Sequence, residues 1–73
     1  MIKSIFKEEY KNVIKKLKKA RLEAGLNQVE VAEILKTNQS FISKIEIGER
    51  RIDVIELKIL ADIYKQDINY FFK

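Results

Sequence analysis

The sequence contains no cysteine, no histidine and no proline, and glycine occurs only at Gly25 and Gly48. Without cysteine and histidine the chain cannot form a disulfide, a zinc finger or another His–Cys metal site, so we expect no metal and no cofactor. Proline and glycine interrupt regular structure. Their scarcity beside abundant Lys, Glu, Leu and Ile predicts an all-α protein.

Long apolar runs are also missing. No stretch approaches the roughly 20 apolar residues of a membrane span, and the N-terminal residues lack the apolar run of a signal peptide. With neither disulfides nor metals, a chain of 73 residues depends on tight helix packing and on oligomerisation for its stability. We therefore expect one small, soluble, cytoplasmic domain that does not associate with a membrane.

The sequence also lacks the groups that most catalysis requires. It has no His or Cys, no glycine-rich phosphate loop and no cluster of carboxylates on an apolar wall. No constellation in the chain is suited to acid–base or nucleophilic chemistry. We therefore expect that the protein is not an enzyme.

Basic residues are concentrated in the first third of the chain. Residues 1–24 contain eight basic and three acidic residues, whereas residues 25–51 contain four of each, and the net charge of the whole chain is +4. This distribution fits an anionic partner. A lysine-rich helix face is, however, more often a solvated surface than a binding site.

Apolar spacing and capping residues predict the helices. A stripe with spacings of three and four residues predicts an amphipathic first helix that ends near Ala24, where Gly25 closes it; its members are Phe6, Tyr10, Val13, Ile14, Leu17 and Ala20. Asn27 is a favoured N-cap, and Glu30 completes a capping box for a second helix that ends near Lys36.

Asn38 is the expected N-cap of a third helix over residues 39–46, which Gly48 closes. Two short helices joined by a turn of three or four residues form a helix-turn-helix. Asp53 is expected to cap a fourth helix, and a fifth short helix is expected after Asp67. The sequence thus predicts one domain of five helices.

The third predicted helix has two different faces. Ile42 and Ile45 share the inward face, while Ser40, Ser43 and Lys44 point the other way. In a major groove, Gln pairs with adenine, Lys donates to guanine and Ser serves either base. This face therefore suits base reading, although ordinary polar surface is the simpler alternative.

The spacing around this helix resembles the phage-repressor-like (XRE family) helix-turn-helix. The resemblance covers residues 13–72 and is carried by Leu17, Ala20-Arg21, Gly25-Leu26-Asn27-Gln28, Val31-Ala32, Leu35, Gln39 to Arg50, Leu57, Leu60-Ala61, Tyr64 and Phe71. It implies a five-helix, lambda-repressor-like domain at residues 13–73, with the helix-turn-helix at about 28–46 and residues 1–12 as an N-terminal extension of the first helix.

The resemblance further implies a transcriptional regulator, such as a repressor. It would bind double-stranded DNA as a homodimer on a pseudo-palindromic operator, with the third helix in the major groove. Minimal relatives include Cro-like repressors, restriction-modification controllers and antitoxin-type autoregulators, all bacterial or phage-encoded. Because the chain ends close to the end of the module, no small-molecule ligand is expected.

Residue roles follow from the same resemblance. The base-contacting residues would be Gln39, Ser40, Lys44, Ser43 and Asn38. The phosphate-contacting residues would be Gln28, Asn27, Arg50 and Arg51, although the two arginines could instead belong to a solvated loop. Arg21 and Glu46 align with a structural ion pair between the first and third helices.

Two residues depart from the family pattern. Phe41 is larger than usual and either packs over the second helix or contacts a thymine methyl or a sugar; we favour packing. Ile47 stands where a polar residue is more usual and would reach DNA or a partner subunit. Residues 1–12 precede the family core, so the resemblance gives them no role.

The dimer interface is expected at the C-terminal aromatics Tyr70, Phe71 and Phe72, with Ile55, Ile59 or Ile63 as further candidates. Helical spacing spreads three consecutive aromatics around an axis, so at least one should be exposed, and exposed aromatics favour interfaces. The alternative is that two are core residues and one is incidentally exposed.

Two other functions remain open from the sequence. The fold could serve as a protein-interaction module that does not bind DNA, in which case binding would depend on the C-terminal aromatics and not on Gln39 or Lys44. The basic first helix could instead lie on a membrane surface.

Overall fold

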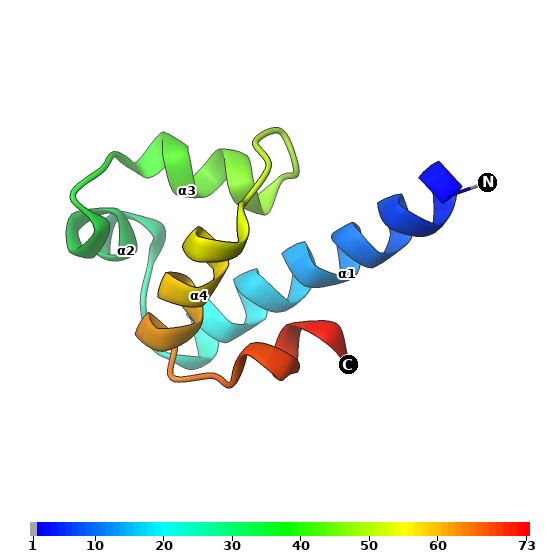
Figure 1. Ribbon diagram of the computed structural model, residues 1–73. Coiled ribbons are helices and arrows are strands. Elements are labelled where there is room, and N and C mark those ends of the chain that lie inside the picture. The colour runs from blue at the N-terminus through cyan, green and yellow to red at the C-terminus, as the bar shows by residue number, and fades with distance from the viewer. Residues whose placement is uncertain (1) are drawn as a thin grey trace.

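The computed structural model describes the backbone of residues 2–73 and the side chains of residues 7–73. This part of the chain contains four α-helices, one short 3₁₀ helix and no strand (Figure 1): α1 (Ile2–Glu23), α2 (Gln28–Leu35), α3 (Gln39–Glu46), α4 (Val54–Ile63) and η1 (Ile68–Phe72). The all-helical class is confirmed. The expected packing of Phe6 falls outside the described side chains.

The expectation of a fifth α-helix requires a correction, because η1 is a 3₁₀ helix of five residues. The Asp67 side chain accepts a hydrogen bond from the Asn69 N–H at 2.8 Å, and the Tyr70 N–H donates to the Asp67 carbonyl at 2.9 Å. Such i→i+3 bonds are typical of short helical pieces. The fold therefore ends in a tight turn that carries Phe71 into the core.

Capping residues set the starts of the helices, as predicted. Asn27, Asn38 and Asp53 are the N-caps of α2, α3 and α4, and each side chain accepts a backbone N–H three residues later. Glu30 completes the expected capping box on α2. At the other ends, Gly25 (φ +76°) and Gly48 (φ +82°) adopt the left-handed conformation that closes α1 and α3.

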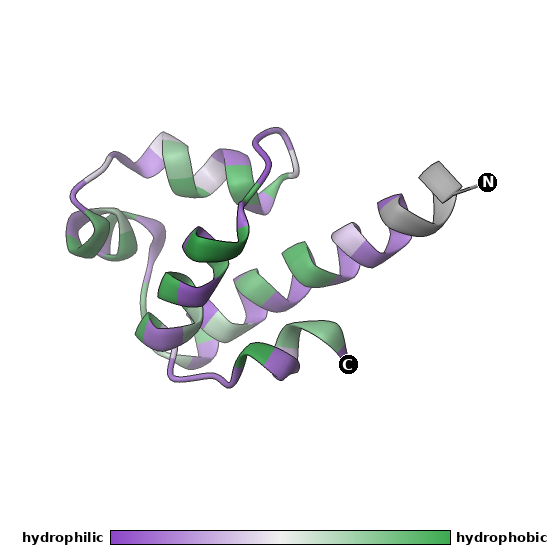
Figure 2. Ribbon diagram, viewed as in Figure 1, coloured by the Kyte–Doolittle hydropathy of each residue, from purple (hydrophilic) through white to green (hydrophobic). Residues whose placement is uncertain are grey.

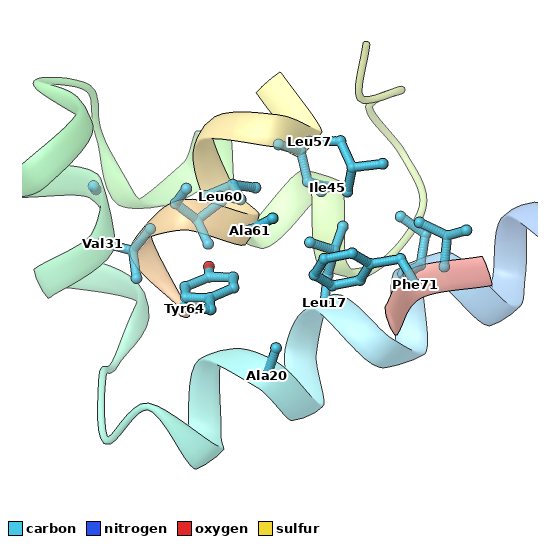
Figure 3. Close-up of a cluster of buried hydrophobic side chains, with 13 residues drawn as sticks. Leu17, Ala20, Val31, Ile45, Leu57, Leu60, Ala61, Tyr64 and Phe71 are labelled. Atoms are coloured by element: carbon cyan, nitrogen blue, oxygen red, sulfur yellow. The ribbon is translucent and has the colours of Figure 1, made fainter. Parts of the chain in front are cut away.

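The core lies where α1 crosses the other helices. Figure 3 shows Leu17 of α1 beside Phe71 of η1, with Leu60 of α4 and Tyr64, the residue after α4, on the other side. Burial raises the pKa of Tyr64, and the charge of Glu46 adds to this effect. The buried hydrophobic residues are Val13, Ile14, Leu17, Ala20, Val31, Ala32, Ile42, Ile45, Leu57, Leu60, Ala61, Tyr64 and Phe71.

The N-terminal half of α1 projects beyond the other helices (Figure 1). η1 packs along one side of α1, and α3 contacts another side. In the described part of α1, apolar and polar residues alternate with helical spacing, so a green stripe runs beside a purple one in Figure 2. A continuous α1 thus connects the core to the projecting N-terminal half of the helix.

Candidate nucleic-acid interface

α2 and α3 form a compact helix pair joined by a short turn at residues 36–38. The Thr37 N–H donates to the Ala32 carbonyl at 2.9 Å, and Lys36 adopts a left-handed conformation (φ +58°), so the chain reverses within three residues. Val31 of α2 and Ile42 of α3 are buried. Because the apolar faces are turned inward, the polar face of α3 is presented to solvent.

A chain of hydrogen bonds runs from α1 to the first turn of α3. The Arg21 Nε donates to Glu46 Oε2 at 2.7 Å, and Arg21 Nη2 donates to Glu46 Oε1 at 3.0 Å. The Gln28 Nε2 donates to the same Glu46 Oε1 at 3.0 Å, and the Gln39 Nε2 donates to Gln28 Oε1 at 3.1 Å. Four side chains from three helices therefore form one network.

The Arg21–Glu46 ion pair lies inside the protein. The two side chains are only 7% and 4% exposed. Arg21 Nη1 also donates to the Leu26 carbonyl at 3.0 Å, and the hydrogen bond to Glu46 raises the pKa of Arg21 against the opposing effect of burial. The pair joins α1 to α3 and leaves Glu46 turned away from solvent.

The Glu46 carboxylate fixes the direction of the whole network. A carboxylate only accepts hydrogen bonds, so the Gln28 amide must present its NH₂ group to Glu46 and its oxygen to Gln39. Gln39 must in turn use its own NH₂ toward Gln28. Its carbonyl oxygen and its second N–H remain for a partner outside, and adenine requires this pair of groups for bidentate recognition.

The N-caps of α2 and α3 leave hydrogen-bond donors at both helix starts. Asn27 Oδ1 accepts from the Glu30 N–H at 2.8 Å, and the Asn27 N–H donates to Glu30 Oε1 at 2.8 Å. The capping box thereby satisfies two backbone donors and leaves those of Gln28 and Val29 for an external acceptor. A helix start with free N–H groups suits a phosphate.

The α3 cap has a similar arrangement. Asn38 Oδ1 accepts both the Phe41 N–H at 3.0 Å and the Ser40 hydroxyl at 2.7 Å. The amide NH₂ of Asn38 and the lone pairs of the Ser40 hydroxyl remain for contacts outside. Along α3, Lys44 is exposed, whereas Ser43 is half-buried. Of the predicted base-contacting residues, Asn38, Gln39, Ser40 and Lys44 are thus exposed, and Ser43 is partly covered.

The two arginines of the loop after α3, Arg50 and Arg51, differ in their contacts and in their exposure. Arg50 forms an ion pair with Glu56 at 3.0 Å, donates to the Arg51 carbonyl at 2.7 Å and lies 4.3 Å from the centre of the Phe41 ring. Phe41 is half-buried against the core, which agrees with packing. Arg51 is exposed and lies 4.8 Å above the Tyr10 ring. Arg51 is therefore the more accessible cation.

Tyr10 connects this loop to α1. Its hydroxyl accepts the Ile52 N–H at 2.9 Å and lies 3.5 Å from the Arg50 carbonyl, to which it donates. The sequence pattern placed Tyr10 only in the apolar stripe. The contact could have been found from the residue type, because the hydroxyl of a half-buried tyrosine in an apolar stripe needs a hydrogen-bond partner.

The predicted dimer residues separate in the structure. Phe71 is 1% exposed and belongs to the core, so its assignment to an interface is wrong; the 3₁₀ turn directs it toward α1. Tyr70 is half-buried and packs against the core, with its ring edge-on to Phe71 at 5.1 Å. Phe72 is 64% exposed.

A group of exposed apolar side chains lies on α4 and η1. Val54, Ile55 and Ile68 are exposed and surround a shallow hollow with Lys58 and Asp62 at its edge. The sequence pattern indicates Ile55 as a further interface candidate and predicts no interface role for Val54 or Ile68. The available signal is that Val54 and Ile68 are β-branched residues directly after the caps Asp53 and Asp67.

None of the helices in the described part of the chain combines the length and apolarity that crossing a bilayer requires.

No curated protein and no solved structure matches the chain. The family model described as "Helix-turn-helix" matches residues 17–71 and so covers most of the chain, including every element of the network. The chain therefore belongs to the phage-repressor-like (XRE) helix-turn-helix family of DNA-binding transcription regulators.

Proposed function

We propose that this protein is a sequence-specific regulator of transcription that inserts α3 into the major groove of double-stranded DNA. The observation that carries the proposal is the network Arg21–Glu46–Gln28–Gln39, because it orders Gln39 before any DNA is bound. A preordered side chain loses less conformational entropy on binding than a free one. The polar face of α3 is then ready to read base edges.

Base and phosphate contacts divide along this surface. Gln39, Ser40 and Lys44 are proposed to contact base edges, with Ser43 and Asn38 beside them. Gln28 and Asn27 at the start of α2, and Arg51 after α3, are proposed to contact phosphates and set the position of α3. Arg50 supports this contact indirectly, because its ion pair with Glu56 holds the loop.

We further propose that the protein acts as a homodimer. One recognition helix reads only a few base pairs, which gives too small a specificity ratio in a genome. Two-fold symmetry doubles the site and favours a pseudo-palindromic operator. The apolar surface of Val54, Ile55 and Ile68 is the proposed contact between subunits, because it is exposed and lies apart from the polar face of α3.

The protein is proposed to act by binding alone, without catalysis, metal or small-molecule ligand. Repression is the simplest outcome, since an occupied operator excludes polymerase. Bacterial or phage operators lie in the cytoplasm, which is the proposed location.

Selection of bound duplexes from a random DNA library at about 150 mM salt, close to physiological ionic strength, tests the proposal. We expect an inverted repeat whose half-sites lie about 10 base pairs, one helical turn, apart. Binding that ignores sequence would overturn it. A pull-down of a protein partner that depends on Phe72 but not on Gln39 would instead identify a protein-interaction module.

A further inference from the structure

Three lysines form a line on the projecting half of α1. Lys7, Lys11 and Lys15 follow one another at four-residue spacing, and all three are exposed. We call them the α1 lysine stripe. The stripe precedes the residues that match the family model, which begin at Leu17. The helix-turn-helix by itself therefore gives these lysines no function.

The stripe borders a cleft that reaches the end of α3. The cleft has a volume of about 680 Å³, and Tyr10, Ile14 and the α1 lysine stripe line its α1 side. Ile47, Gly48 and Arg51 line the opposite side. Among the described lining residues Glu46 is the only acidic one, and Arg21 already neutralises it. The cleft is thus a cationic region without a compensating free carboxylate.

The cleft adjoins the C-terminal end of α3. Ile47, which follows Lys44 by three residues and directly follows α3, is exposed and lines the cleft. The other side of α1 is occupied: Lys16 donates to the Tyr70 carbonyl at 3.1 Å and to the Lys73 carbonyl. Lys16 is therefore engaged with the C-terminal end of the chain, whereas the α1 lysine stripe stays exposed along the cleft beside α3.

We propose that the α1 lysine stripe, together with Arg51, is a second phosphate-binding surface that holds the DNA backbone beside the C-terminal end of α3. This inference rests on the proposed function. Eight residues of helix span about 12 Å, and one strand carries a phosphate about every 3.4 Å along the axis, so a stripe aligned with the DNA axis would extend past about three phosphates.

Lysine is a suitable residue for a surface that binds the phosphates of a DNA backbone. Its ammonium group is a flexible point charge that contacts phosphate without reading sequence. The stripe therefore adds affinity and salt dependence to binding while Gln39 and Lys44 keep the sequence preference. A DNA backbone fits the stripe better than an apolar peptide does, because the three charges stand in a row at the exposed rim of the cleft.

The test compares two triple variants with the same change in charge. One is Lys7→Gln, Lys11→Gln and Lys15→Gln; the matched control is Lys36→Gln, Lys65→Gln and Lys73→Gln, whose lysines are exposed, lie outside the cleft and do not belong to α1. Circular-dichroism melts first establish that both fold like wild type. Kd is then measured across a salt series on the operator selected by wild type and on a scrambled duplex.

The stripe variant should reduce the slope of log K against log salt by about one unit for each lysine that contacts a phosphate. Its ratio of operator to scrambled affinity should stay at the wild-type value. The control should change the slope much less. Hydroxyl-radical footprinting should show that wild type protects backbone positions beside the α3 contact that the stripe variant leaves open.

Equal slopes and footprints for the two triple variants would overturn the inference, since general charge would then explain the effect. Loss of base preference in the stripe variant would overturn it too, because the stripe would then act on specificity. Failure of wild type to select any sequence would instead refute the proposed function, so the two failures are distinguishable.

Discussion

Glu46 shows how a charged residue on the proposed recognition helix α3 can serve the structure. A carboxylate in a groove would be repelled by phosphates, but Glu46 is turned inward to Arg21 and Gln28. Its two oxygens accept three hydrogen bonds from Arg21 and Gln28. One residue therefore ties α1 to α3 and orients the amide of Gln28, through which it orders Gln39.

Glu46→Ala is expected to lower the free energy of unfolding by about 3–5 kcal/mol, because it leaves the Arg21 guanidinium buried without its partner. Chemical denaturation followed by circular dichroism measures the change. Glu49→Ala removes an exposed carboxylate from the same region and should melt like wild type. If the two variants have equal stability, the ion pair does not stabilise the fold.

Lys44→Ala is expected to relax base preference at one position of the half-site by about 1–3 kcal/mol, because the exposed ammonium group is the proposed partner of a guanine. Competition binding with single-base operator variants measures this discrimination. Unchanged base preferences in Lys44→Ala would refute the assignment of Lys44.

Gln28→Ala is expected to act differently: it should weaken binding to all operators, because the proposed phosphate contact is lost. It should also reduce the preference for adenine, since Gln39 loses the hydrogen bond from its side chain to Gln28.

At the scale of elements, the loop between α3 and α4 depends on contacts from three directions. Tyr10 of α1 binds its backbone, Phe41 of α3 lies under the Arg50 guanidinium, and Glu56 of α4 accepts from both Arg50 and the Asp53 N–H. The loop is therefore held in place before DNA binds, and Arg51 is carried by a fixed backbone.

The Arg50–Glu56 contact predicts a pH dependence. The hydrogen bond from Arg50 lowers the pKa of Glu56 in the folded protein, so the pair stabilises the fold at neutral pH. This stabilisation is lost as pH falls from the unfolded pKa of about 4.3 through the lower folded value. Glu56→Gln keeps an oxygen for the Asp53 cap but removes the charge.

Thermal melts at several pH values should show wild type more stable than Glu56→Gln at pH 7, with a difference that shrinks below pH 4. Glu49→Gln removes another carboxylate and should follow wild type throughout. A constant difference between wild type and Glu56→Gln across the pH range would exclude the ion pair as its source.

At the scale of the whole molecule, the polar face of α3 and the apolar surface of α4 and η1 occupy different regions. The first carries the network to Gln39, whereas the second exposes Val54, Ile55 and Ile68. A molecule with both surfaces can bind DNA and a second copy at once. The proposed DNA surface and the proposed subunit contact therefore use different residues.

Ile55→Asp is expected to convert a dimer into a monomer, because Ile55 is 61% exposed in the single chain and a carboxylate would be buried at the contact. Sedimentation equilibrium measures the change, and operator affinity should fall with it. Ile34→Asp, at an exposed position on α2, is the matched control and should remain dimeric. Dissociation by Phe72→Asp instead of Ile55→Asp would move the contact to the C-terminal aromatic.

The sequence by itself determined the local features: helical periodicity, the caps Asn27, Asn38 and Asp53, and the closing Gly25 and Gly48. Each depends on residues within a few positions of one another, so short-range physics is enough to predict it. Tertiary structure decided the rest. Phe71 is buried and Phe72 exposed because η1 packs on α1, and Arg50 turns to Glu56 because α4 returns beside the loop. The Gln28–Gln39 bond joins residues 11 positions apart, a relation that only the packing of two helices creates.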